Sequence, residues 1–344
     1  MQDLSNEMQL LMSTSIFRGI GSKDFMGMDL LWEIRTIRAE NTVWYQGQSA
    51  SELAIVVNGE LRVQINQQVL GRISKGELVG ELAVFTDDFR SATVVANEED
   101  VTLLVLSKDA LRLLRDGHWT IYNRLLNAAL NRLGNRIRLT NLQIAKKSKG
   151  TDAQVKAQEP SWLGSMMSKL PFGQEPTAPS AVSVLRKLPG MQSAHPMCVQ
   201  KIMSAMTPRY IAKGKPLVLE GDAGNSAFLL VEGVIEVYRN VRGGMAQHLA
   251  SLYPGALLGT GSLILGERRN ASCVASKNTV VWVYEMSKAQ SDSLMDESSI
   301  LWRESLLSAL AFQLRTADEL LVLIEQGQRP ESDYDKVRRT LSGY

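Results

Sequence analysis

Cysteine and histidine are scarce in this 344-residue chain. The two cysteines, Cys198 and Cys273, cannot build a disulfide framework in a chain of this length, so we expect both to be structural thiols in a reducing compartment. The three histidines stand far apart, and no Cys/His cluster has the spacing of metal ligands. The sequence therefore predicts no metal site.

Long apolar runs are missing as well. No apolar stretch approaches the roughly 20 residues that an α-helix needs to cross a bilayer. The first seven residues are polar and acidic, which is unlike a signal peptide. We expect a cytoplasmic protein with no membrane span.

The chain also lacks an excess of charge and the common catalytic motifs. Its 38 basic and 36 acidic residues give a formal net charge of +2, so we expect no nucleic-acid partner. No glycine-rich phosphate loop, serine nucleophile elbow or His-Glu zinc motif occurs, and no histidine has a partnered nucleophile. These absences predict a protein that is not an enzyme and needs no cofactor.

What the sequence does contain is a succession of short strand-like segments between helical ones. Helical patterning covers about 4–31 and returns over 108–145. Short apolar or alternating segments broken by glycine are typical of a β-barrel or sandwich, so the expected class is α+β, mainly β with helices. The predicted strands are 42–45, 52–57, 60–65, 69–73, 91–96 and 101–106.

The strand pattern occurs twice. In each copy the first two of four landmarks lie 12 residues apart and the last two lie 10 apart, while the middle interval is 21 residues in the first copy and 26 in the second. The extra residues fall at 239–247, where two adjacent glycines predict a longer hairpin. This agreement indicates a duplicated domain. The landmarks are Gly47, Gly59, Gly80 and Arg90 in the first copy and Gly221, Gly233, Gly259 and Arg269 in the second.

Composition divides the chain into four parts. We assign 1–145 to the first domain and 183–326 to the second, each long enough for its own core. Between them, 146–182 is rich in proline, glycine and lysine, as a flexible linker is. Its apolar island, Trp162–Leu170, is either a docking segment or locally collapsed linker. The remainder, 327–344, is a polar tail.

A heptad seam follows each strand region. Each seam is under three heptads, too short to require a coiled coil. Packing against the domain's own barrel and a homodimer through these helices both remain open. The seam residues are Leu126, Leu130, Leu133, Ile137, Thr140 and Ile144 in the first copy and Leu307, Leu310, Leu314, Ala317, Leu321 and Ile324 in the second.

Two runs within the first copy carry its chemistry: Gly80-Glu81-Leu82-Ala83 and Arg90-Ser91-Ala92-Thr93-Val94. Together they resemble the phosphate-binding cassette of cyclic-nucleotide-binding domains, the family of the cyclic AMP-dependent kinase regulatory subunit and the catabolite activator protein. The resemblance covers about 10–145 and 184–325. It implies two tandem β-roll (double-stranded jelly-roll) domains, each flanked by helices.

The arginine is the centre of the predicted first site. A guanidinium can contact two phosphate oxygens at once, and we assign this role to Arg90. The alternative is a surface arginine paired with Asp87 or Asp88. Gly80 allows close backbone approach, and a short helix over 82–86 would direct its first N–H groups at the anion.

The resemblance implies roles for the neighbouring residues. Glu81 corresponds to the acid that accepts from the ribose 2′-hydroxyl, although an ion pair with a basic residue such as Arg90 is the alternative. Backbone amides of Ala83 and Ser91 correspond to phosphate donors. The Ser91 hydroxyl can touch the phosphate or a guanine amino group, so cyclic AMP (cAMP) is preferred and cyclic GMP (cGMP) stays open. The predicted first site is Gly80, Glu81, Leu82, Ala83, Arg90, Ser91 and Ala92.

The second copy of the cassette is degraded. Arg269 keeps the phosphate position, but Thr260 replaces the carboxylate. Three interpretations remain: an empty structural copy, which we favour, a weaker site, or a site for a different anion. The predicted second site is Gly259, Thr260, Gly261, Arg269 and Asn270.

The resemblance implies a receptor in which ligand binding in the first domain changes a conformation that an unknown protein partner reads. One rival is a kinase-inhibiting regulatory subunit, although no pseudosubstrate precedes the first domain. A second is a DNA-binding regulator, but the residues beyond Ile324 are too few for a helix-turn-helix. A ligand-free dimeric scaffold is the third.

The resemblance also implies that a residue of the helix after the barrel covers the base. Candidate lids over the base are Asn135, Arg136, Thr140 and Asn141.

Overall fold

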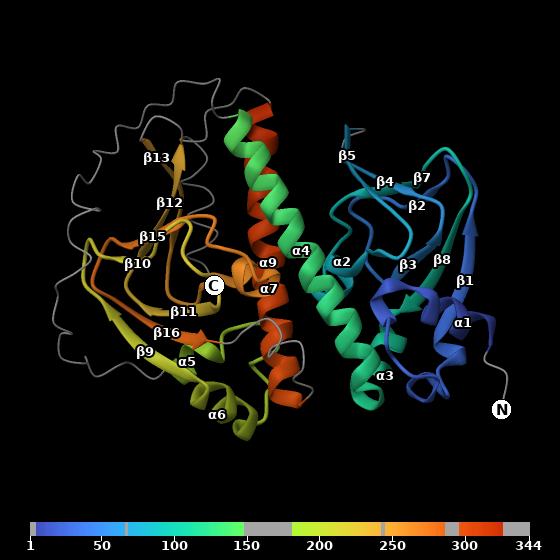
Figure 1. The fold of residues 1–344 in the computed structure, drawn as a ribbon, viewed down its shortest axis with the longest axis horizontal. Helices are drawn as coiled ribbons and strands as arrows, with labels where there is room; N and C mark the ends of the chain where they lie inside the picture. The colour runs from blue at the N-terminus through green and yellow to red at the C-terminus, as the bar shows by residue number, and fades with distance from the viewer. Residues whose placement is uncertain (1–4, 66–67, 148–180, 242–244, 286–295, 326–344) are drawn as a thin grey trace. The chain divides into compact units, whose positions relative to one another are not determined.

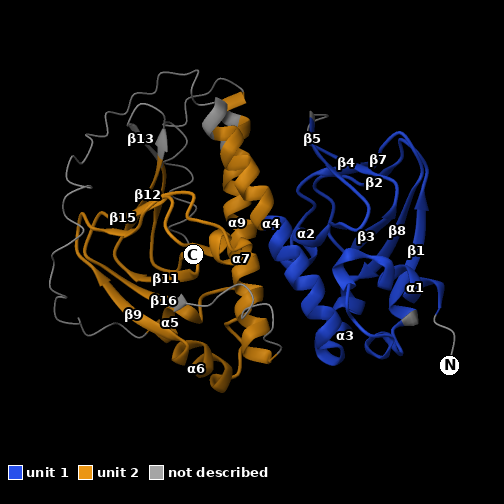
Figure 2. Cartoon of the chain, viewed as in Figure 1, with its two compact units in different colours: residues 1–133 blue, residues 134–344 orange. Residues whose placement is uncertain are grey.

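Antiparallel strands form two four-stranded sheets in each half of the chain (Figure 1). The structure is a computed structural model that describes residues 5–65, 68–147, 181–241, 245–285 and 296–325. The chain divides into two compact units, 1–133 and 134–344 (Figure 2). The long helix α4 (Trp119–Lys147) runs through this boundary, whereas the predicted first domain extends to residue 145.

Unit 1 contains two four-stranded sheets, with strand orders β1-β8-β3-β6 and β2-β7-β4-β5. This arrangement is the β-roll that the sequence predicts. Its elements are α1 (Asn6–Ser13), β1 (Trp32–Ile37), β2 (Thr42–Trp44), β3 (Glu52–Asn58), β4 (Leu61–Ile65), β5 (Gln68–Ile73), β6 (Leu78–Val79), α2 (Glu81–Phe85), β7 (Thr93–Ala96), β8 (Val101–Ser107), α3 (Lys108–Gly117) and the first part of α4.

Apolar side chains from both sheets meet in the core of the roll. On β3, Ala54 and Val56 face this core together with Trp44 of β2. Leu53 and Ile55, which alternate with them along the strand, are buried as well, on the opposite face. Helix α2 contacts β3, and α3 contacts β8. Burial on both faces explains why β3 reads as a continuous apolar run rather than as an alternation.

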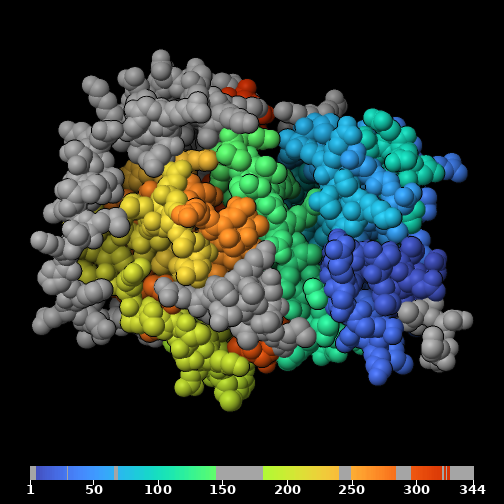
Figure 3. All heavy atoms as spheres, viewed as in Figure 1, coloured from blue at the N-terminus to red at the C-terminus, as the bar shows by residue number. Residues whose placement is uncertain are grey.

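One edge of the second sheet is exposed. Strand β5 ends the order β2-β7-β4-β5 and pairs only with β4 among the described strands. Its Val69 and Leu70 are 52% and 38% exposed. The light-blue part of the chain, to which this strand belongs, lies at the surface in the space-filling view (Figure 3). Elsewhere in unit 1, Tyr45 and Phe89 are also exposed, at 58% and 65%.

Unit 2 repeats the architecture in the same order. Its sheets run β9-β16-β11-β14 and β10-β15-β12-β13, which confirms the duplication. The elements are α5 (Ala181–Leu185), α6 (Pro196–Ser204), β9 (Met206–Ile211), β10 (Pro216–Val218), β11 (Ser226–Glu232), β12 (Ile235–Val241), β13 (Met245–Leu252), β14 (Leu257–Leu258), α7 (Thr260–Leu265), β15 (Ser272–Ala275), β16 (Thr279–Glu285) and α9 (Glu297–Glu325), after the end of α4.

The extra residues of the second copy lie in its β12–β13 hairpin. Strands β12 and β13 are each two residues longer than β4 and β5, their counterparts. The sequence placed the insertion in this hairpin, and the structure confirms it.

Three predictions about elements need correction. The helix expected over 4–31 ends at Ser13 in the described chain, because Thr14 turns extended and Gly19 and Gly27 adopt positive φ; 3₁₀ turns follow it. The helix expected over 108–145 is broken at His118, where φ and ψ are −131° and 60°. The strand expected over 91–96 begins at Thr93.

The two seams meet within unit 2. Ile144 of α4 packs with Ala317 and Leu321 of α9, and Ile324 lies against this cluster. Seam residues thus find partners in the same chain, while the homodimer stays a prediction.

Several predictions concern residues outside the described ones. They are residues 148–180 of the linker expected over 146–182, with its apolar island, and the tail over 327–344; the two ends of that linker, 146–147 and 181–182, belong to the helices α4 and α5. Both cysteines are described and are free and buried, and burial raises the pKa of Cys273 to about 12 against the opposing charge of Arg269. Among the described helices, none combines the length and apolar character needed to span a membrane.

Candidate functional site

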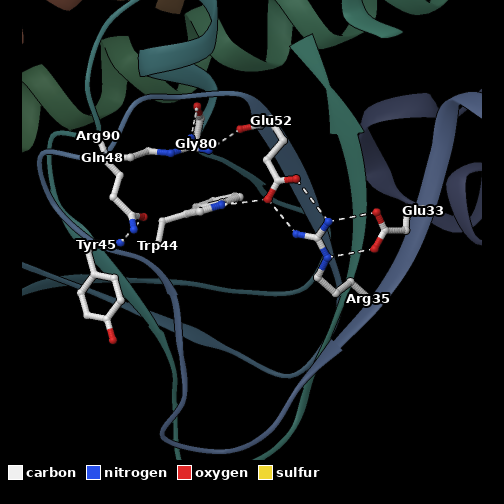
Figure 4. A network of polar contacts seen from close by, with 8 residues as sticks. All are labelled: Glu33, Arg35, Trp44, Tyr45, Gln48, Glu52, Gly80 and Arg90. Carbon is white, nitrogen blue, oxygen red and sulfur yellow. Dashed lines mark hydrogen bonds and ion pairs between the residues drawn. The ribbon is translucent and has the colours of Figure 1, made fainter. Parts of the chain in front are cut away.

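The backbone of Arg90 is held by the loop between β2 and β3 (Figure 4). Its N–H donates to the carbonyl of Gln48 at 2.8 Å, and its carbonyl accepts from the N–H of Gly47 at 2.9 Å. The same loop is tightened by the Gln48 side chain, which accepts from the N–H of Tyr45 at 3.0 Å. These bonds set the point from which the arginine side chain enters unit 1.

The Arg90 side chain is buried, with 5% of the residue exposed. Nη1 donates to the carbonyl of Gly80 at 3.1 Å and Nη2 to the carbonyl of Glu52 at 2.6 Å. The guanidinium lies over the Trp44 ring, 3.9 Å from its centroid. Nε has no hydrogen-bond partner among the described residues.

The alternative of a surface arginine paired with an aspartate is wrong. Asp87 is exposed and forms its ion pair with Lys108 instead. Arg90 forms no ion pair with a carboxylate of the described chain, because its acceptors are neutral carbonyl oxygens.

Gly80 is required by the position of Arg90. It precedes α2 with φ at 77°, in the left-handed region that side chains rarely adopt. A Cβ at this position would lie 2.5 Å from Nη1 of Arg90 and 2.9 Å from the Trp44 ring. The close approach is therefore to the protein's own arginine and tryptophan.

A polar network surrounds the guanidinium (Figure 4). The Glu52 carboxylate accepts from Nε1 of Trp44 at 2.9 Å and from Arg35 at 2.7 Å, and Arg35 also pairs with Glu33. Burial acts to raise the pKa of Glu52, but the bonds from Arg35 and Trp44 and the charges of Arg35 and Arg90 outweigh it and lower that pKa.

Burial dominates the electrostatics of Arg90. It lowers the pKa of the guanidinium from the ordinary 12.5 to about 10, against the opposing charges of Glu52 and Glu81. A buried cation is costly unless it is paired, and here every acceptor that it contacts is neutral. An anion beside Arg90 would remove this cost, so the arrangement suits a negatively charged ligand.

Glu81 is also buried, with 7% of the residue exposed. The expected ion pair exists, but with Arg132 of α4 rather than with Arg90: Nε of Arg132 lies 3.5 Å from Oε1. Arg132 also donates to Glu77 at 2.9 Å. Within unit 1, the acid of the cassette is therefore tied to α4.

The other predicted residues of the first site lie around these groups. Leu82 and Ala83 are buried in α2, which covers the predicted short helix with a shift of one residue. Ala92 is buried and Ser91 is half-buried. Their assigned contacts with phosphate stay predictions.

The second copy holds its arginine in the same way. Arg269 is 4% exposed, with Nη1 bonded to the carbonyl of Gly259 at 3.0 Å and Nη2 to that of Ser226 at 2.7 Å. Gly259 has φ at 71°, and a Cβ there would lie 2.4 Å from Nη1. Phe228 takes the place of the tryptophan, with its ring centroid 5.3 Å away.

The remaining residues of the second site differ in exposure. Thr260 is 1% exposed, Gly261 is half-buried and Asn270 is exposed. The structure thus brings Gly259, Thr260 and Arg269 together and leaves the Asn270 side chain at the surface.

Sequence reasoning missed four residues of the first site. Trp44, Glu52 and Gln48 come from strands and a loop that precede the cassette, and Arg132 comes from the helix after the roll. The 12-residue interval from Gly47 to Gly59, which recurs from Gly221 to Gly233, was the one available signal for the loop. Nothing in the local pattern marks the other three.

The candidate lids lie in unit 2. Arg136 and Thr140 contact Asp318 of α9 at 2.7 and 3.3 Å, and the carbonyl of Asn141 accepts from Arg239. Asn135 receives only a long contact from Arg138, at 3.5 Å. No His, Cys, Asp or Glu cluster within the described ranges could hold a metal ion.

Comparisons with known proteins agree with this geometry. The profile of the family described as "Cyclic nucleotide-binding domain" matches residues 34–118 and 208–298. A cyclic AMP receptor protein of Thermus thermophilus is 36% identical over 81 residues, which are 24% of this chain and 38% of that protein. A cGMP-dependent protein kinase of Toxoplasma gondii is 22% identical over 295 residues, 84% of this chain and 23% of the kinase. The chain thus spans well under half the length of these curated relatives.

Among solved structures, the regulatory domain of Toxoplasma gondii PKA with cAMP is similar. It shares 18% identity, and the alignment covers 88% of this chain and 97% of that one, with a TM-score of 0.31. The family profile covers both rolls, and both rolls place an arginine beside the glycine of the cassette. The chain therefore belongs to the cyclic nucleotide-binding domain family, of which it contains two copies.

Proposed function

We propose that the first domain is a non-enzymatic receptor for a cyclic nucleotide, with cAMP preferred. The observation that carries the proposal is the environment of Arg90, a buried cation whose acceptors are backbone carbonyls. A cyclic phosphodiester brings one negative charge, which would compensate the guanidinium where the protein supplies no directly bonded carboxylate. The Nε of Arg90, which lacks a partner in the described chain, is the donor that we assign to the phosphate.

Recognition of the ribose falls to Glu81. Its Oε1 faces Arg132, so Oε2 is the oxygen that we assign to the 2′-hydroxyl. A carboxylate has enough lone pairs to accept from both partners. Binding would then act on a residue that is tied to α4, and we propose that a shift of this helix is what a protein partner reads.

Titration calorimetry on the full chain tests the phosphate contact. Two charge-assisted hydrogen bonds are worth about 3–6 kcal/mol, so Arg90→Ala should weaken cAMP binding by roughly 10²–10⁴-fold. Arg90→Lys keeps a charge without the fork and should still lose most of the affinity. Arg72→Ala, at an exposed ion pair with Glu60, is the matched control. Unchanged affinity in a folded Arg90→Ala chain would remove Arg90 from the site.

Competition between cAMP and cGMP tests which base the first domain prefers. The relatives include a cyclic AMP receptor protein and a cGMP-dependent protein kinase, so both ligands belong in the titration. We expect cAMP to bind more tightly than cGMP. If the Ser91 hydroxyl serves a guanine amino group, cGMP would win, and Ser91→Ala would reverse the order.

A protein kinase is the first partner class to test. The cGMP-dependent kinase of Toxoplasma gondii aligns with 84% of this chain, across both domains. Kinase activity that co-purifies with the chain and is released by cAMP would support a regulatory-subunit role. A gel shift with genomic DNA at moderate salt tests the DNA-binding alternative.

A further inference from the structure

The second domain keeps a buried arginine where it has lost the acids. Arg269 donates a hydrogen bond to the carbonyl of Gly259, just as Arg90 donates to the carbonyl of Gly80 in the first domain. The two neighbouring carboxylates of the first site are replaced by hydroxyls, because Ser226 stands at the start of β11 where Glu52 starts β3, and Thr260 follows the cassette glycine. The arginine on α4 that pairs with Glu81 has no counterpart bonded to Thr260 in the described chain.

The replacements leave Arg269 with neutral partners. Its Nη2 donates to both the carbonyl and the Oγ of Ser226, each at 2.7 Å, and no carboxylate of the described residues forms an ion pair with it. Burial lowers the pKa of Arg269 and outweighs the opposing influence of Cys273, which is a neutral thiol at neutral pH, and of Asp222. A buried guanidinium without a counter-ion is expensive and carries no packing advantage over an apolar side chain.

Two polar groups at this site are buried and unpartnered. Nε of Arg269 and Oγ1 of Thr260 have no hydrogen-bond partner among the described residues, and Thr260 is only 1% exposed. Buried polar atoms in folded proteins are nearly always satisfied, so two in adjacent parts of one site point to a bound molecule that accepts hydrogen bonds. A phosphate can accept from both.

The charged groups around each arginine indicate which kind of phosphate group each site prefers. In the first domain, Glu52 and Glu81 offset part of the cationic field of Arg90, which suits a ligand with one negative charge. Arg35 and Arg132 pair with these two carboxylates, so the domains differ less in net charge than in what stands next to the arginine; in the second domain hydroxyls replace both carboxylates, and nothing at those positions repels a second negative charge. A phosphate monoester carries nearly two charges at pH 7, whereas a cyclic phosphodiester carries one.

We propose that the second domain binds a phosphate monoester, such as a non-cyclic nucleotide, more tightly than a cyclic nucleotide. The proposal shares the assignment of arginine as a phosphate ligand with the proposed function. It does not depend on whether the first domain binds cAMP. Thr260 supplies a hydroxyl to the phosphate in place of a carboxylate that would repel it.

Calorimetry with AMP and cAMP tests the proposal on the full chain carrying Arg90→Lys, which disables the first site. We expect AMP to bind with a stoichiometry near one and about tenfold or more tighter than cAMP. Adding Arg269→Lys should weaken AMP binding by about tenfold or more. Adding Thr260→Glu instead should weaken AMP and so reverse or erase the preference.

The outcomes separate the two proposals. No AMP binding in the Arg90→Lys chain, AMP binding unaffected by Arg269→Lys, or tighter binding of cAMP than of AMP would each overturn the inference. The proposed function is judged separately, from cAMP binding to a chain that carries Arg269→Lys with Arg90 intact. If Arg90→Lys does not fold, the AMP isotherms of the wild-type and Arg269→Lys chains supply the same comparison.

Discussion

Backbone carbonyls position the buried guanidinium groups of Arg90 and Arg269 in the same way. Each is bonded through Nη1 to the carbonyl of a positive-φ glycine and through Nη2 to the carbonyl of the first residue of a central strand. The backbone determines the pose, and the side chains around it determine the charge. Differences in ligand preference between the two domains therefore belong to the residues next to each arginine.

Gly80→Ala tests this placement. The positive φ should cost about 1–2 kcal/mol of stability. The new Cβ would lie 2.5 Å from Nη1 of Arg90 and should therefore displace the guanidinium. We expect cAMP affinity to fall by about tenfold or more, measured by calorimetry beside urea unfolding. Gly71→Ala on β5, where a Cβ meets nothing within 4 Å, is the control. Normal affinity in Gly80→Ala would show that Arg90 is not held as described.

The pH dependence of binding follows from the pKa of Arg90. The guanidinium stays charged below its pKa of about 10, so cAMP affinity should be flat between about pH 6 and 9 and fall above about pH 10. Because the folded pKa lies below the ordinary 12.5, loss of this proton relieves the cost of burial, and this group adds stability as pH rises from 10 toward 12.5. Weaker binding there, with an unchanged circular dichroism spectrum, is the expected result. A flat profile through pH 11 would contradict it.

At the scale of elements, α4 is the helix whose arginines form ion pairs in both units. In unit 1, Arg132 binds Glu77 and Glu81. One turn further on, in unit 2, Arg136 binds Asp318 of α9, a carboxylate whose pKa burial raises despite the nearby arginine and Thr140. One continuous helix thus carries an ion pair to the cassette acid and an ion pair to the last described helix.

Arg132→Ala tests the first of these contacts. The arginine contacts Glu81 through one oxygen only, at 3.5 Å, and so long a contact from an arginine that still reaches solvent is worth about 0.2–1 kcal/mol. We therefore predict a loss of cAMP affinity of about two- to fivefold by calorimetry. Arg72→Ala removes an equally simple ion pair from β5 and should change nothing. Tighter binding in Arg132→Ala would mean that the arginine competes with the ribose for Glu81.

At the scale of the whole molecule, each unit has its own hydrophobic core. Trp44, Val56 and Leu103 belong to that of unit 1, and Phe228 and Val281 to that of unit 2. Separate cores allow one domain to be stabilised by a ligand without the other.

Differential scanning calorimetry makes this measurable. A ligand at 100 times its dissociation constant adds about 2.7 kcal/mol to the domain that binds it, which corresponds to a rise of about 5–15 °C in its transition. We expect cAMP to raise one transition, and Arg90→Lys to abolish that rise. Equal shifts of all transitions would show that the chain unfolds as one cooperative unit.

Local pattern determined much of this architecture in advance. Short apolar segments between glycines predicted six strands of unit 1, and the repeated landmarks predicted unit 2 and its longer hairpin. It failed for β1 and β6 and for the helix over 4–31. Strand β6 is two residues long, and β1 begins directly after the expected helical range, where no strand was predicted. Periods of 2 and 3.6 cannot be told apart over such short spans.

The sequence by itself determined the duplication, the family cassette and the identity of its arginine and acid, because these depend on residue types at short, fixed spacings. Only the tertiary structure decided what surrounds them. Trp44 and Glu52 reach Arg90 from β2 and β3, which belong to different sheets, and Arg132 reaches Glu81 from α4. The burial that gives Arg90 its need for an anion likewise comes from contacts between segments far apart in the chain, and such contacts leave no period or spacing for a sequence to display.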